Sequence, residues 1–118
     1  MKSICIKRIY EPPEPSDGAR ILVDRLWPRG IARDKARVEA WLKDVAPSDA
    51  LRRWFAHDSE RWPEFQARYI AELRHNPAAA ELLNIARKSK AITLLFAAKD
   101  RVHNNAIVLR QFLEDGRA

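Results

Sequence analysis

The spacing of hydrophobic residues predicts strands near both ends of the chain. Residues 4–10 are mostly β-branched or aromatic and partly alternate with polar ones, a pattern typical of a strand. Residues 19–24 form a second apolar segment, and the prolines within 11–18 exclude regular structure between the two. Residues 92–98 are a continuous apolar run, which is typical of a strand buried on both faces of a sheet.

Helical spacing dominates the middle of the chain. Apolar residues at i, i+3, i+4 and i+7 predict a helix over 38–45. A short helix is expected after Ser48, whose side chain is suited to cap it. A further apolar stripe predicts a helix over 62–73, and Asn76 followed by Pro77 is a typical start of the next one.

The order of these elements predicts an α/β fold. Two strands are followed by four helices, then by the buried strand and by a closing helix that contains Ala106. This order favours a small three-layer sandwich, in which helices cover a short, mostly parallel sheet of about three or four strands. The direction of the first strand stays open on this argument, because eight residues, 11–18, are short for a parallel crossover.

Composition limits the class of protein more than it identifies a function. With 118 residues, 47% of them hydrophobic and 32% charged, the chain fits one folded domain and excludes a disordered protein. No apolar run approaches the ~20 residues of a membrane span, and charge returns at Lys7, too early for a signal peptide. The single Cys5 excludes an internal disulfide, and we expect a buried, inert thiol in a reducing, cytoplasmic setting.

Three stretches of the sequence carry a family resemblance. They are LVDRLWPRG at 22–30, WLKDVAPS at 41–48 with WFAHD at 54–58, and LLFAAKD at 94–100 with His103-Asn104. In this order and spacing they resemble the YeaO-like branch of the DUF488 family (domain of unknown function 488). The resemblance implies one domain over residues 1–118 and a parallel first strand. Val102 stands where more distant relatives tend to have cysteine, so no thiol chemistry is expected there.

Polar residues follow the second and the last expected strands, which suggests a shared site. In open α/β sheets, ligands bind at the carboxyl ends of the strands, and neighbouring parallel strands bring these ends to one edge. Asp24 and His103 are the candidate catalytic residues. The candidate ligand-binding residues are Arg25, Trp27, Arg29, Lys99, Asn104 and, from the resemblance, His57.

Each candidate also has a structural interpretation. An arginine beside Asp24 would lower the pKa of its carboxyl group and favour a salt bridge over acid–base chemistry. His103 suits proton transfer near neutral pH, but equally a hydrogen bond to Asp100. Asn104 is also suited to cap the closing helix. Trp27 lies in a loop with proline and glycine, and its functional interpretation is stacking on a ligand. The three histidines lack ligand spacing and no cofactor motif is present, so neither a metal nor a cofactor is expected.

The charge balance favours a partner that carries phosphate, because Lys and Arg number 22 against 16 Asp and Glu. The leading interpretation is a protein that recognises an anionic small molecule bearing a phosphate or nucleotide. Whether it is an enzyme or a ligand-binding domain stays open. It predicts a pocket that holds Asp24, Arg29 and His103 together. A nucleic-acid-binding or regulatory accessory protein predicts a basic stripe instead, and a protein-interaction module is the third interpretation. No membrane contact is expected, and the oligomeric state is left open.

Overall fold

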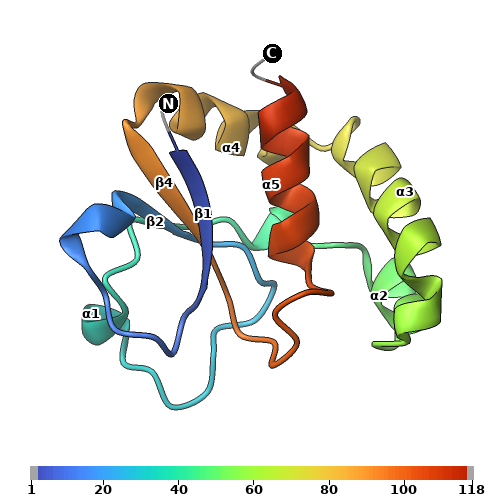
Figure 1. The fold of residues 1–118 in the computed structure, drawn as a ribbon, viewed down its shortest axis with the longest axis horizontal. Helices are drawn as coiled ribbons and strands as arrows, with labels where there is room; N and C mark the ends of the chain where they lie inside the picture. The colour runs from blue at the N-terminus through green and yellow to red at the C-terminus, as the bar shows by residue number, and fades with distance from the viewer. Residues whose placement is uncertain (1–2, 117–118) are drawn as a thin grey trace.

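A four-stranded parallel sheet organises the computed structural model, which describes residues 3–116 (Figure 1). The strands are β1 (Ser3–Arg8), β2 (Ala19–Leu22), β3 (Ala40–Trp41) and β4 (Ala91–Phe96), in the order β1-β4-β2-β3. All three neighbouring pairs are parallel, the first strand included. The carboxyl ends of the strands therefore meet at one edge, and the predicted α/β fold is confirmed.

Five helices surround this sheet unevenly. They are α1 (Arg33–Ala36), α2 (Asp49–Phe55), α3 (Trp62–Leu73), α4 (Pro77–Lys88) and α5 (Asn105–Gly116). Helices α2 to α5 lie on one side of the sheet, whereas the single turn of α1 and long loops lie on the other (Figure 1). Three short 3-10 turns lie between the strands and helices of residues 3–116: η1 (Pro15–Asp17), η2 (Lys43–Val45) and η3 (Ser59–Arg61). None of the helices within residues 3–116 is long and apolar enough to cross a membrane.

Alternation along β2 and β4 divides the core into two clusters. Ile21, Leu94 and Phe96 belong to the larger cluster, which is filled by side chains of α2 to α5. Leu22 and Leu95 point to the other face, into a small cluster with the half-buried Trp27 and Trp41 among others. Most of the apolar burial therefore lies under the four helices.

Helix starts in the middle of the chain follow the predicted capping residues. The Ser48 hydroxyl accepts a hydrogen bond from the Leu51 backbone N–H at 3.2 Å and begins α2. The Asn76 side chain accepts from the Ala78 N–H at 2.9 Å, and Pro77 occupies the first position of α4. Caps of this kind stabilise a helix by about 1 kcal/mol each.

The prediction of a helix over 38–45 is wrong. This segment contains the short edge strand β3 and the 3-10 turn η2. Trp41 packs into the small cluster, whereas the next residue, Leu42, packs against the large one on the other face of the sheet. The apolar residues therefore match helical spacing without sharing one face. The Leu42 N–H pairs instead with the Leu22 carbonyl at 3.0 Å.

Cys5 is exposed, which corrects the expectation of a buried thiol. Its strand β1 lies at the outer edge of the sheet. Ile4 and Ile6 face the large cluster and pack against it. Because side chains alternate along a strand, Cys5 points to the opposite face, where no long helix covers the edge strand.

A buried ionic cluster occupies the less covered face of the sheet. The Asp17 carboxylate accepts hydrogen bonds from Arg20 at 2.6 Å, from Lys7 at 3.2 Å and from the Glu14 N–H at 3.0 Å. Arg20 also donates to the carbonyl of Ala36 at 2.8 Å, which ties α1 to the sheet. Burial raises the pKa of Asp17, but these hydrogen bonds and the charge of Lys7 outweigh it and hold the pKa below its ordinary value.

Candidate functional site

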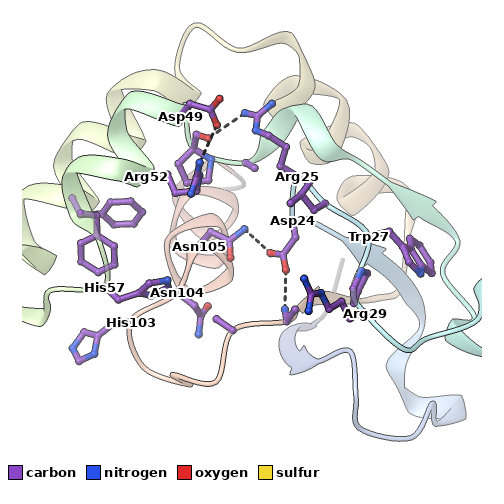
Figure 2. A pocket seen from close by; sticks show the side chains of 18 of the residues that line it. Asp24, Arg25, Trp27, Arg29, Asp49, Arg52, His57, His103, Asn104 and Asn105 are labelled. Carbon is purple, nitrogen blue, oxygen red and sulfur yellow. Dashed lines mark hydrogen bonds and ion pairs between the residues drawn. The ribbon is translucent and has the colours of Figure 1, made fainter.

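A pocket of about 670 Å³ lies at the edge where the strands end (Figure 2). Its walls come from the loop after β2, the loop after β4, the first residues of α5 and the segment around α2. Parallel strands bring these loops together although they are about 70 residues apart in sequence. Among the predicted site residues, those that line it are Asp24, Arg25, Trp27, Arg29, His57, His103 and Asn104.

Asp24 lies in the middle of the pocket, and each of its carboxylate oxygens accepts one hydrogen bond. One carboxylate oxygen accepts from the Ala97 N–H at 2.8 Å, and the other accepts from the Asn105 side-chain amide at 3.1 Å. The same amide donates to the Val23 carbonyl at 3.0 Å, so Asp24 links the end of β2 to β4 and α5. Figure 2 shows the two hydrogen bonds to the Asp24 carboxylate as dashed lines.

The electrostatic expectation for Asp24 is wrong in its direction. Burial raises the pKa of the Asp24 carboxyl group above its ordinary value, and the hydrogen bonds from Ala97 and Asn105 oppose this only in part. Among residues 3–116, no arginine forms an ion pair with Asp24. The side chain of Arg25 turns instead to Pro47, to whose carbonyl it donates a hydrogen bond at 3.1 Å.

Three arginines give the pocket its positive character. Arg25 has an Nε–H that is buried and has no hydrogen-bond partner within the described part of the chain. Arg52 approaches Asp49 at 3.6 Å, and both side chains are more than half exposed. Arg29 is exposed at the mouth of the pocket. Within residues 3–116, Asp24 and Asp49 are the only acidic residues that line this pocket, so cations outnumber carboxylates there.

His103 is held in a tight loop that precedes α5. Asp100 accepts hydrogen bonds from the backbone N–H groups of Val102 and His103, each at 2.9 Å, and its other oxygen lies 3.0 Å from His103 Nδ1. The backbone bonds from His103 and Val102 and the imidazole contact lower the pKa of Asp100 to about 2. Asn104 caps α5 by accepting from the Ile107 N–H at 3.1 Å. The alternatives of an Asp100 contact and a helix cap are therefore both present.

The remaining candidates lie at the margins of the pocket. His57 follows α2 with a left-handed backbone (φ 57°), directly after Ala56 in the same region (φ 48°). Two consecutive non-glycine residues there indicate a locally strained turn beside the pocket. Trp27 is half-buried, and its indole N–H donates to the Ile31 carbonyl at 2.8 Å, so it forms a fixed wall. Lys99 lies outside this pocket and lines a smaller adjacent hollow.

Four pocket residues were not among the candidates predicted from the sequence: Arg52, Phe55, Phe65 and Asn105. Arg52 and Phe55 come from α2, and Phe65 comes from α3. Their apolar members look like ordinary core positions, and only the packing of α2 and α3 brings them to the strand ends. Asn105 had a usable signal, because an asparagine that begins a helix after a buried strand lies at the same edge as Asp24.

Comparisons with known proteins agree with the resemblance carried by the sequence motifs. A family model described as "Inactive DUF488-N3 subclade" matches residues 3–118. A protein called "Uncharacterized protein Rv3073c" from Mycobacterium tuberculosis (strain ATCC 25618 / H37Rv) is 45% identical over 108 residues, which cover 92% of this chain and 91% of that protein. "Uncharacterized protein YeaO" from Escherichia coli (strain K12) is 43% identical over 112 residues, covering 94% and 96%. No solved structure matches the chain significantly.

Proposed function

The chain belongs to the DUF488 family, and from this premise and the pocket geometry we propose that it is a ligand-binding domain for an anionic small molecule. The ligand class is a compound with a phosphate group, such as a nucleotide. The observation that carries the proposal is the excess of arginines over carboxylates in the pocket lining, three against two. Arg25, Arg29 and Arg52 line it, while Asp24 already accepts two hydrogen bonds.

The chemistry of the lining supports an anion with an apolar body. Guanidinium groups bind phosphate or carboxylate through two parallel hydrogen bonds. The walls beside them include Phe55, Phe65 and Pro47. Apolar walls exclude water, and a charge–charge attraction is stronger where water is excluded. The hydrogen bond to the Pro47 carbonyl fixes the Arg25 guanidinium in the pocket wall.

Several contacts support binding without turnover. Both oxygens of Asp24 accept hydrogen bonds, from Ala97 and Asn105, so this carboxylate joins the loop after β4 to the start of α5. The contact between His103 Nδ1 and Asp100 anchors the loop before α5. The description of the matching family model as an inactive subclade agrees with this assignment. Asp24 is then a positioning residue that fixes the loop after β4.

The first test is thermal unfolding in the presence of inorganic phosphate, nucleotides and short oligonucleotides, at low and high salt. A small ligand at about 100 times its Kd adds about 2.7 kcal/mol to the free energy of unfolding, which raises Tm by about 10 °C. The Arg25→Met variant should lose this shift. The matched control Arg74→Met should keep it, because Arg74 is exposed at the end of α3 and does not line the pocket.

Other outcomes of this experiment favour the alternatives. Shifts with oligonucleotides alone that vanish at high salt would favour a nucleic-acid-binding role, since contacts to the phosphate backbone weaken steeply with salt. The absence of any shift would contradict ligand binding and favour a protein-interaction module. The proposed setting is the cytoplasm, where a single exposed thiol such as Cys5 stays reduced.

A further inference from the structure

Exposed large hydrophobic side chains gather at one edge of the molecule. Within residues 3–116 there are three of them, Tyr10 at 46%, Leu26 at 79% and Val102 at 63% exposure. They follow β1, β2 and β4, the three strands that lie side by side at the carboxyl edge of the sheet. Single exposed apolar residues are common on protein surfaces. Here all three share the edge that also holds the pocket.

Contacts between the loops join these positions into one surface. The Tyr10 hydroxyl donates to the Arg29 carbonyl at 3.2 Å, which links the loop after β1 to the loop after β2. Arg101 pairs with Glu11 at 3.3 Å, which links the loop after β1 to the loop after β4. The surface formed by Tyr10, Leu26, Arg29, Lys99 and Val102 is called the rim below.

The rim carries positive charge that is not neutralised. Arg29 and Lys99 are exposed, and neither side chain forms a hydrogen bond or ion pair within the part of the chain that the structure describes. Glu11 pairs with Arg101, and Asp100 keeps its negative charge although its own loop donates hydrogen bonds to it. Arg29, Lys99 and Arg101 outnumber these two carboxylates. A complementary surface is therefore acidic and presents apolar groups to Leu26 and Val102.

We propose that the rim docks an acidic segment of another protein that carries at least one large apolar side chain. Apolar anchors surrounded by matching charge are a recurrent mode of peptide recognition. A second copy of this chain fits poorly, because it would bring the same positive charge to the contact. A nucleic acid would also neutralise Arg29 and Lys99, and the test below distinguishes it from a peptide. Tyr10, Leu26 and Arg29 belong to both the rim and the pocket lining. The inference goes beyond the ligand in the pocket because Val102 and Lys99 do not line it.

The test is a selection of random peptides, displayed on phage, on the immobilised full chain. The selected peptides are expected to be acidic and to contain a leucine or an aromatic residue. Fluorescence anisotropy of the labelled peptides then measures their Kd. Val102→Ser should weaken binding about tenfold, and Lys99→Ser should weaken it less and remove part of its salt dependence. The matched control Val102→Ile, which keeps the apolar surface, should bind as the unmodified chain does.

The inference would be overturned by a selection without acidic enrichment, or by selected peptides that bind Val102→Ser as tightly as the unmodified chain. Displacement of the peptides by a short oligonucleotide with equal affinity would also contradict it and would favour a nucleic acid at the rim. The thermal shift with small anions is measured on Val102→Ser in parallel. Its retention there, with peptide binding lost, separates the rim from the pocket.

Discussion

Two aspartates near the ends of β2 are both withdrawn from water, yet the protein shifts their pKa values in opposite directions. Asp17 precedes β2 and faces two cations, Arg20 and Lys7, and its pKa is lowered. Asp24 follows β2 and accepts only from the neutral N–H groups of Ala97 and Asn105, and its pKa is raised. At Asp17 the two cations therefore outweigh the cost of burying the carboxylate, and the ionised form stabilises the fold. At Asp24 no cation offsets the cost of burial, so the ionised form is disfavoured. This carboxylate lies in the pocket.

The largest expected effect comes from removing the charge of Asp17. The Asp17→Asn variant leaves Arg20, which is only 5% exposed, without its counter-ion, whereas Lys7 keeps its ion pair with Glu14. Breaking a buried ion pair from one side costs about 3 kcal/mol or more. Urea unfolding followed by circular dichroism measures this loss. The exposed Asp34→Asn is the matched control and should change stability by less than about 0.5 kcal/mol.

Gly18 offers a way to disturb the same region without changing its charge. Its φ is 65°, and a Cβ atom there would collide with the carbonyl oxygen of Ala91. Gly18→Ala should cost about 2 kcal/mol from backbone strain and the displaced strand. The same urea unfolding measures it. Gly30→Ala also has a positive φ but open space around it, so it should cost less; equal losses would contradict the role of the Ala91 contact.

Asp24→Asn should be milder than Asp17→Asn. It removes a charge that burial disfavours, and it loses part of the hydrogen bonding to Ala97 or Asn105, so the two effects partly cancel. We expect a loss of about 1 kcal/mol or less in urea unfolding. A loss as large as that of Asp17→Asn would show that the Asp24 charge is compensated and would contradict the comparison.

The two variants should also differ in the sign of their pH dependence. The stability that Asp17 contributes is present above its ordinary pKa of 3.8 and is lost as the pH falls through its lower folded value. The unmodified chain should therefore approach Asp17→Asn in stability in acid. As the pH falls, Asp24 binds its proton at a higher pH in the folded chain than in the unfolded chain. The stability of the unmodified chain, relative to Asp24→Asn, should therefore rise as the pH falls from the raised pKa towards 3.8. Urea midpoints from neutral to about pH 3 give both differences.

The smallest effect on global stability is expected at Asp100, whose side chain is 44% exposed. Asp100→Asn weakens the acceptor for the backbone N–H groups of Val102 and His103. Hydrogen exchange of these two amides should become faster while the urea midpoint stays nearly unchanged. Unchanged exchange at both amides would show that the loop is held by other contacts, such as the Asn104 cap.

Much of the fold could be predicted where the signal is local. The stripe over 62–73, the cap at Asn76 and the apolar run at 92–98 each correspond to an element in the structure. The segment 38–45 could not, because Trp41 and Leu42 belong to opposite faces of a sheet whose order the sequence does not show. The prediction that Cys5 is buried was wrong for the same reason, because its exposure depends on β1 being an edge strand.

The candidate site followed from topology more than from motifs. Parallel strand ends were sufficient to place Asp24 and His103 around one pocket. The direction of the Asp24 pKa shift was not predictable from sequence proximity to Arg25, because that side chain turns away to Pro47. Arg52 joins the pocket through the packing of α2, and no spacing along the chain indicates this.

The strand that completes the sheet is synthesised late. β4 is paired on both sides, and its register sets Ser3 opposite Ala91 and Ala19 opposite Ile92. During translation, β1 and β2 therefore leave the ribosome long before the strand that separates them exists. β2 can pair with β3 early, but neither β1 nor β2 can pair with β4 until most of the chain has emerged. The centre of the sheet therefore forms through contacts between distant residues, which are slow to close. Until then the edge of β1, with its exposed thiol, is open to other chains.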